Sequence, residues 1–255
     1  MQIGTIYLVG AGPGPADLLT LRAARLIECA RVIVHDGLVG PDILAMVRSD
    51  ARLISVAKQR ARHTMPQDDI NALLVREALQ GHDVVRLKGG DPFIFGRGGE
   101  EAETARAAGV PVEIVPGISA ANGAAAASGI ALTHRDASSI VSFVAGQCKG
   151  LSEQDWSGLA GKGRTLVIYM GVSTTAQIAD KLMADGLAPD MPVAVIENAA
   201  RPEMRVLRGL LAGLPHLVAR EAVKSPALIV IGDVTARDNI AVAALAQVTR
   251  EQAAI

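Results

Sequence analysis

Short runs of β-branched and aliphatic residues alternate with amphipathic segments along most of the chain, and this alternation restricts the fold more than any other feature. Helical periodicity predicts helices over residues 17–30 and 68–80, with Gly81 and Gly109 as candidate C-caps. The apolar runs predict strands at residues 5–9, 32–35, 53–56, 84–87, 112–115, 140–145, 166–170, 193–196 and 228–231. Such alternation is typical of an α/β fold with mainly parallel sheets, whose ligand sites lie beyond the carboxyl ends of the strands.

A chain of 255 residues has room for one large α/β domain or for two smaller ones. The best internal boundary lies at Pro116 and Gly117, after which an alanine-rich helical stretch begins, and the strand pattern starts again near Ser139. We therefore expect an N-terminal α/β domain over residues 1–116 and a C-terminal α/β domain over residues 117–245, with a cleft between them.

The charges are almost balanced, with 25 basic and 26 acidic side chains and a formal net charge of -1. No global field favours a nucleic acid, so we expect no nucleic-acid partner. The most continuous apolar stretch, residues 118–132, is interrupted by polar residues and glycines, and we expect no membrane segment. Cys29 and Cys148 lack metal-ligand spacing, and together with the absence of a basic, apolar leader they predict a protein of the reducing cytoplasm.

A glycine-rich segment, residues 10–14, follows the first predicted strand and precedes the first predicted helix. Such a loop lets a ligand approach the backbone, and Asp36 at the end of the second strand is placed like the ribose-binding acid of an NAD-dependent oxidoreductase. The dinucleotide fingerprint needs a third glycine at position 15, where this chain has Pro15. The loop alone therefore leaves two alternatives open: a nucleotide-binding domain, and a tight turn without a ligand.

The most informative segment is residues 86–101, which read RLKGGDPFIFGRGGEE. Paired glycines at a strand end allow close backbone approach, and Asp91 offers a carboxylate to an ammonium or hydroxyl group. Each glycine costs conformational entropy, so their number here favours a ligand site over a structural loop. Two further segments, residues 116–121 and 129–135, carry small side chains that suit either a ligand-binding floor or close helix packing.

Taken in order, these segments closely resemble the uroporphyrinogen-III C-methyltransferases, which belong to the tetrapyrrole methylase family. The resemblance spans about residues 3–235 and rests on residues 9–14, 34–36, 86–101, 116–118, 132–135, 169–171, 192–198 and 225–232. It implies a two-domain α/β protein that forms a homodimer and binds S-adenosylmethionine in the cleft between its domains. It also implies C-methylation of uroporphyrinogen III at C2 and C7, which gives precorrin-2 and S-adenosylhomocysteine for the siroheme, cobalamin or haem d1 branch.

The resemblance also implies roles for individual residues. Asp36 and Lys58 occupy the positions of a proton acceptor and a proton donor, and Arg97 is a further candidate for proton transfer. Arg97, Glu100 and Arg135 are the expected substrate-binding residues: the two arginines would bind carboxylates of the substrate, and Glu100 lies one helical turn beyond Arg97. The positions that contact the methyl donor in the family correspond to Pro13, Gly89, Gly90, Asp91, Ile94, Ser119, Ala120, Met170 and Ala199.

No metal is expected, because His63 and His134 lack further ligands nearby and are interpreted as hydrogen-bonding residues. The chain departs from the family pattern at Pro15, after Lys58 and at residues 146–148, and these departures affect substrate preference more than the methyl donor. The alternatives are a methyltransferase acting on a later precorrin, an NAD-binding oxidoreductase domain, and a non-catalytic protein that has kept the fold.

Overall fold

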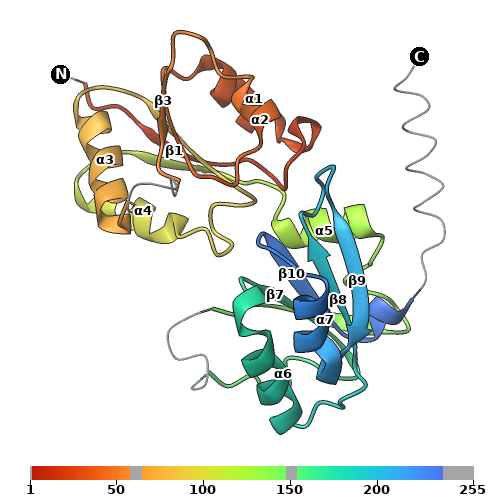
Figure 1. Ribbon diagram of the computed structural model, residues 1–255. Helices are drawn as coiled ribbons and strands as arrows, with labels where there is room; N and C mark the ends of the chain where they lie inside the picture. The colour runs from red at the N-terminus through yellow and green to blue at the C-terminus, as the bar shows by residue number, and fades with distance from the viewer. Residues whose placement is uncertain (1, 58–64, 148–153, 238–255) are drawn as a thin grey trace, which may run out of the picture. The chain divides into compact units, whose positions relative to one another are not determined.

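The computed structural model describes residues 2–57, 65–147 and 154–237. The chain divides into two compact units, Met1–Ala120 and Ala121–Ile255, and each contains one five-stranded sheet (Figure 1). None of the helices in the described part of the chain is both long and apolar enough to cross a membrane.

The sheet of the first unit has the strand order β3-β2-β4-β1-β5, and all of its neighbouring strands run parallel. Its strands are β1 (Ile6–Gly10), β2 (Val32–His35), β3 (Arg52–Ser55), β4 (Val84–Lys88) and β5 (Val112–Val115). Parallel strands require crossover connections, which here carry the helices. These helices are α1 (Leu21–Cys29), α2 (Pro41–Leu44), α3 (Gln67–Leu79) and α4 (Gly98–Ala107).

Side chains alternate between the two faces of this sheet, and both faces are buried. On one face, Leu8 and Val84 pack with residues of α3 and α4. On the other face, Ile33 and Leu87 pack with residues of α1 and α2. The central strands β1, β2 and β4 are therefore almost entirely buried, and their runs of aliphatic residues are easy to recognise in the sequence.

The first helix begins later than predicted. Residues 17–30 do not form one helix, because a 3-10 turn (Ala16–Leu18) comes first and α1 starts at Leu21. Thr20 is the N-cap, and its Oγ1 accepts a hydrogen bond from Ala23 N at 3.2 Å. The predicted C-cap glycines, Gly81 and Gly109, lie one position beyond the observed C-caps, Gln80 and Ala108, and their φ angles of 88° and 73° are in the left-handed region that glycine favours.

The sheet of the second unit has the strand order β6-β7-β10-β8-β9, and only β6 and β7 pair in parallel. The expectation of mainly parallel sheets is therefore wrong for this unit. A hairpin without a helix joins β8 to β9, and β10 runs antiparallel between β7 and β8. The elements are α5 (Ala120–Ser128), β6 (Ser138–Ala145), β7 (Gly163–Tyr169), α6 (Thr175–Ala184), β8 (Pro192–Glu197), β9 (Arg205–Leu210), α7 (Leu214–Arg220) and β10 (Ala227–Ile231).

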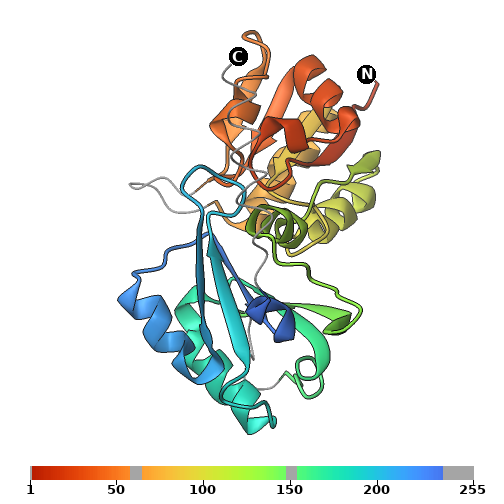
Figure 2. The same cartoon turned by 90° about the vertical axis from the view of Figure 1, so that its right-hand side faces the viewer.

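Helices α6 and α7 cover the same face of this second sheet, as Figure 2 shows. Ile178 of α6 and Leu214 of α7 join Ile168 and Ile229 of the sheet in one buried cluster, which also contains the single tryptophan, Trp156. The cores of the two units thus consist of different residues, and each cluster lies within its own unit.

Candidate functional site

The carboxyl ends of β4, β1 and β5, which are neighbours in the first sheet, bring together three segments that the sequence singles out. Gly90 N donates a hydrogen bond to Gly12 O at 2.7 Å, and Gly12 N donates one to Gly90 O at 3.1 Å. A Cβ added at Gly10 would lie 2.5 Å from Gly117 N. Gly10, Gly12, Gly90 and Gly117 form a junction of three loops, here called the glycine junction. A side chain at Gly10 or Gly117 would force the loops apart, and Gly12 and Gly90 have positive φ angles that favour glycine.

The carboxylate of Asp91 fixes this junction from the side of β4. Its Oδ1 accepts a hydrogen bond from Phe93 N at 2.8 Å, and its Oδ2 accepts one from Gly117 N at 3.0 Å. An ionised carboxylate can accept about four hydrogen bonds, so Asp91 keeps acceptor capacity for a ligand.

Other residues of the first unit that are candidate contacts of the methyl donor surround the same junction. A Cβ added at Gly90 would lie 3.5 Å from Ala120 N and 4.0 Å from Ser119 Cα. Pro13 follows Gly12 and is half-buried, whereas the Ile94 side chain is 37% exposed. The structure thus brings these residues to one edge of the first sheet.

Asp36, the candidate proton acceptor, comes directly after β2, which pairs with β4. Its half-buried carboxylate accepts hydrogen bonds from Leu38 N at 2.9 Å and from Gly89 N at 3.4 Å. The backbone therefore orients the carboxylate beside the paired glycines. Lys58, the candidate proton donor, and His63 lie outside the described residues.

Beneath this edge lies a buried cluster of charged side chains that the sequence reasoning did not assign. Glu101 Oε1 accepts hydrogen bonds from Arg86 Nε at 3.1 Å, Lys88 Nζ at 2.9 Å and Gln67 Nε2 at 3.2 Å. Burial, followed by the nearby Arg86 charge, lowers the pKa of Lys88 below its ordinary value. The available signal was a pair of cations at alternating positions of an otherwise apolar strand, both on one face.

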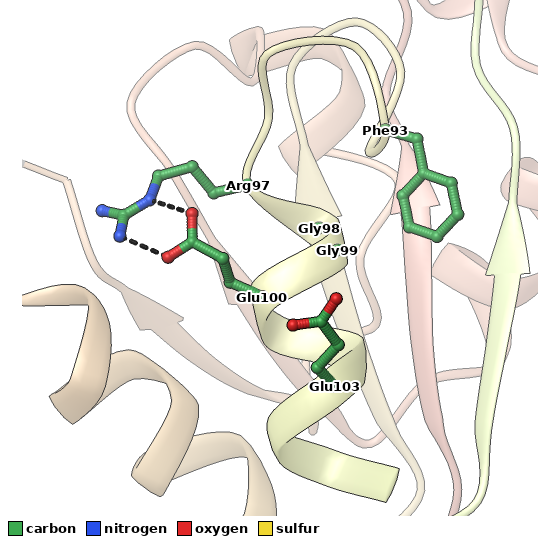
Figure 3. Close-up of a pocket in the computed structure, with 6 residues that line it drawn as sticks. All are labelled: Phe93, Arg97, Gly98, Gly99, Glu100 and Glu103. Carbon is green, nitrogen blue, oxygen red and sulfur yellow. Dashed lines mark hydrogen bonds and ion pairs between the residues drawn. The ribbon is translucent and has the colours of Figure 1, made fainter. Parts of the chain in front are cut away.

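Arg97 and Glu100 meet at the start of α4 in the first unit. Arg97 Nε donates to Glu100 Oε1 at 2.8 Å, and Arg97 Nη2 donates to Glu100 Oε2 at 2.6 Å (Figure 3). This pairing raises the pKa of Arg97 and lowers the pKa of Glu100. The pair borders a pocket of about 390 Å³ that Phe93, Gly98, Gly99 and Glu103 also line.

In the second unit, Met170 follows the end of β7 and Ala199 lies just after the end of β8. Leu228 of β10 pairs with both Tyr169 of β7 and Ile196 of β8, so the segments after these two strands flank the start of β10. Met170 has a φ of 56°, and the residues before and after Ala199 have φ angles of 49° and 59°. Positive φ at residues other than glycine is uncommon and often occurs at functional sites.

Glu197 fixes the end of β8 just before that segment. Its Oε2 accepts a hydrogen bond from Arg205 Nε at 2.6 Å, and its Oε1 accepts one from Lys224 N at 2.9 Å. Burial alone would raise the pKa of Glu197, but the hydrogen bonds from Lys224 and Arg205 outweigh it, and the pKa is lowered.

The structure places Arg135 exposed in the second unit, between α5 and β6. The predicted hydrogen-bonding role of His134 is confirmed, since its Nδ1 accepts a hydrogen bond from Asp136 N at 3.1 Å. Within the residues that the structure describes, no group of three or more His, Cys, Asp or Glu side chains is placed to hold a metal ion.

Chemically, the edge around the glycine junction suits a cationic or polar ligand. It presents the Asp36 and Asp91 carboxylates and closely packed backbone, while the nearby Arg86 and Lys88 are buried and bonded to Glu101. The pocket at α4 offers a different chemistry, because an exposed arginine there can bind carboxylates in a bidentate way.

Comparison with known proteins agrees with the two α/β units. Siroheme synthases of Gluconacetobacter diazotrophicus and Methylococcus capsulatus are 52% and 53% identical to the chain over 233 residues, which are 91% of this chain. The matches cover 50% and 49% of those proteins, so the chain spans about half the length of the curated relatives it matches.

Two solved structures show the same fold. The uroporphyrin-III C-methyl transferase from Thermus thermophilus, complexed with S-adenyl homocysteine, has a TM-score of 0.77 at 38% identity, covering 91% of this chain and 93% of that one. A cobalt precorrin-4 methyltransferase of cobalamin biosynthesis has a TM-score of 0.79 at 25% identity, covering 91% and 95%. The model of the tetrapyrrole (corrin/porphyrin) methylases matches residues 5–215, and the chain therefore belongs to the tetrapyrrole methylase family.

Proposed function

We propose that this chain transfers methyl groups from S-adenosylmethionine to C2 and C7 of uroporphyrinogen III, giving precorrin-2 and S-adenosylhomocysteine. The observation that carries the proposal is the glycine junction with Asp91, which gathers family donor-contact positions at one sheet edge. The similarity to the Thermus enzyme, whose structure holds S-adenyl homocysteine, supports it. Precorrin-2 then serves the siroheme, cobalamin or haem d1 branch.

The residues at this edge fit the methyl donor. The donor supplies an electrophilic methyl group on a cationic sulfur, and the edge presents carboxylates and backbone groups instead of exposed cations. In the proposed mechanism Gly89, Gly90, Asp91 and the neighbouring Ser119 and Ala120 hold the donor in line with the acceptor carbon and exclude water. Pro13, Ile94, Met170 and Ala199 are proposed as further donor contacts.

Methylation of a pyrrole carbon leaves a cationic ring, so a base must remove a proton. We assign this role to the Asp36 carboxylate, which its hydrogen bonds from Leu38 N and Gly89 N orient. Lys58 is the proposed proton donor, and Arg97 is a further candidate for proton transfer. Arg97 and Arg135 are proposed to bind substrate carboxylates, with Glu100 beside Arg97.

The decisive experiment is anaerobic incubation with uroporphyrinogen III and methyl-labelled S-adenosylmethionine, followed by mass analysis of the tetrapyrrole. We expect the product to gain two labelled methyl groups. A protein that binds S-adenosylhomocysteine but leaves uroporphyrinogen III unmethylated would contradict this substrate assignment.

A second candidate substrate is a later precorrin. The cobalt precorrin-4 methyltransferase has a similar TM-score of 0.79, but its identity of 25% is lower than the 38% shared with the Thermus enzyme, which disfavours a later precorrin. Family membership disfavours the NAD-dependent oxidoreductase. Incubating the protein with each precorrin in turn separates the two methyltransferase functions.

The assembly and location are proposed on the resemblance and the composition. We propose a cytoplasmic homodimer without nucleic-acid or membrane partners, in which residues 1–116 and 117–245 form the two domains. Light scattering coupled to size-exclusion chromatography tests the dimer, and a monomer at micromolar concentration would contradict it.

A further inference from the structure

The guanidinium of Arg97 is already occupied by a carboxylate. Two parallel hydrogen bonds of 2.8 and 2.6 Å join it to Glu100, three residues further along the chain. This fork-to-fork geometry is the one in which arginine binds a carboxylate of any ligand. A substrate carboxylate that binds the same edge of Arg97 must therefore displace Glu100.

The pair is placed where such an exchange is possible. The side chains of Arg97 and Glu100 are 54% and 53% exposed, and both line the pocket of about 390 Å³ (Figure 3). Exposed ion pairs add little net stability, because water solvates both charges and two flexible side chains must be held still. Another carboxylate anchored nearby can therefore replace that of Glu100 at small cost.

A second acidic residue in the pocket provides an internal comparison. Glu103 lies one helical turn beyond Glu100 on α4, and it is exposed and lines the same pocket. Figure 3 shows its carboxylate apart from the bonded pair of Arg97 and Glu100. Glu103 therefore contributes the same charge to the pocket without competing for the arginine fork.

We propose that Glu100 is an internal competitor of the substrate, occupying Arg97 until a substrate carboxylate displaces it. The inference rests on the proposed function, in which Arg97 binds a carboxylate of uroporphyrinogen III. Glu100 sets a threshold: a ligand with one carboxylate and no other anchor does not displace it, whereas a ligand held through several carboxylates does. Glu100 is thus a specificity-determining residue for polycarboxylate substrates.

The test compares two neutralised variants in an equilibrium titration. Uroporphyrin III, the oxidised form that carries the same carboxylate arms, is titrated into the wild-type protein, E100Q and E103Q, with binding followed by absorbance. E100Q frees the arginine fork, and we expect it to bind about two- to fivefold more tightly than wild type. E103Q removes the same charge from the same pocket, and we expect a clearly smaller gain. A misfolded variant cannot produce tighter binding, so the expected direction is itself a control.

Placing E100Q in an R97A background completes the test. Without the Arg97 guanidinium, the loss of the Glu100 carboxylate frees no binding partner, so R97A/E100Q should bind uroporphyrin III no more tightly than R97A/E103Q. Equal gains for E100Q and E103Q, or weaker binding of E100Q, would overturn the inference while leaving the proposed function intact. Failure of the wild-type protein both to bind uroporphyrin III and to methylate uroporphyrinogen III would remove the proposed function, and the inference with it.

Discussion

Asp91 connects to Gly117 across 26 residues of sequence, through a hydrogen bond of 3.0 Å from the Gly117 amide to the carboxylate Oδ2. The bond joins the loop after β4 to the turn after β5, and the second oxygen of Asp91 holds the amide of Phe93. The same side chain therefore fixes the glycine junction and offers a hydrogen-bond acceptor to the proposed methyl donor, S-adenosylmethionine.

We expect Asp91→Ala to weaken binding of S-adenosylhomocysteine about 10- to 100-fold, because hydrogen bonds to a charged acceptor contribute about 1.5–3 kcal/mol. Isothermal titration calorimetry measures this loss. Asp91→Asn keeps one acceptor oxygen and should lose less. Unchanged affinity in Asp91→Ala would show that the residue does not support donor binding.

Arg97→Ala should lower turnover of uroporphyrinogen III by about tenfold or more, since it removes a charged partner of the substrate. Arg97 is the exposed N-cap residue of α4 and belongs to the pocket and not to the glycine junction, so affinity for the methyl donor should change by less than about twofold. Steady-state kinetics and calorimetry with S-adenosylhomocysteine test the two parts separately. Equal losses of donor binding in Arg97→Ala and Asp91→Ala would contradict this division of roles.

Gly117→Ala should destabilise the first unit by about 1–3 kcal/mol and weaken donor binding, because its Cβ would overlap the Gly90 carbonyl and approach Gly10 Cα to 2.8 Å. The matched control is Gly99→Ala, where a Cβ meets nothing within 4 Å. In helix α4 that change should stabilise by up to about 1 kcal/mol. Hydrogen exchange of the β1 and β4 amides measures the stability of both variants. If Gly117→Ala were as stable as wild type, the three loops could separate freely.

Glu101→Gln should cost about 3–5 kcal/mol of unfolding free energy, because it leaves the buried cations of Arg86 and Lys88 without their carboxylate. Glu103→Gln lies on the exposed face of the same helix and should change stability by less than about 0.5 kcal/mol. Urea denaturation followed by circular dichroism compares the unfolding free energies of the two variants. Similar midpoints for the two variants would mean that the buried cluster contributes no stability through its charges.

Stability of the second unit should depend on pH through Glu197, whose pKa is lowered in the folded protein from an ordinary value of 4.5. The unfolded chain binds the proton first as the pH falls, so the contribution of Glu197 is complete above about pH 4.5 and is lost as the pH falls through the lowered pKa. Glu197→Gln should therefore be less stable than wild type at pH 7, and the difference should shrink in acid. Parallel urea midpoints for both proteins down to acid pH would contradict this.

The fold of the first unit is largely predictable from the sequence. Its central strands are buried on both faces, so the apolar run of residues 32–35 is continuous and matches an observed strand, as do residues 112–115 at the sheet edge. Strand β9 has no such signal, because Arg205 and Arg208 interrupt it at the sheet edge. The antiparallel order of the second sheet also depends on pairing between distant strands, which local periodicity does not encode.

For the candidate site, the sequence indicates the loops but not the bonds between them. Residues 86–101 are recognisable from their glycines, whereas the partnership of Asp91 with Gly117 depends on the order of β4, β1 and β5. The bonded state of Arg97 is equally hidden, since sequence spacing allows an i,i+3 pair with Glu100 without requiring it.

Trp156 is the one tryptophan of the chain, and it is 2% exposed within the core of the second unit. Its fluorescence therefore reports on the folding of that unit. A denaturation curve followed by this signal is silent about unfolding of the sheet that carries Asp36 and Asp91. A protein that looks fully folded by tryptophan emission can already have lost its proposed donor site.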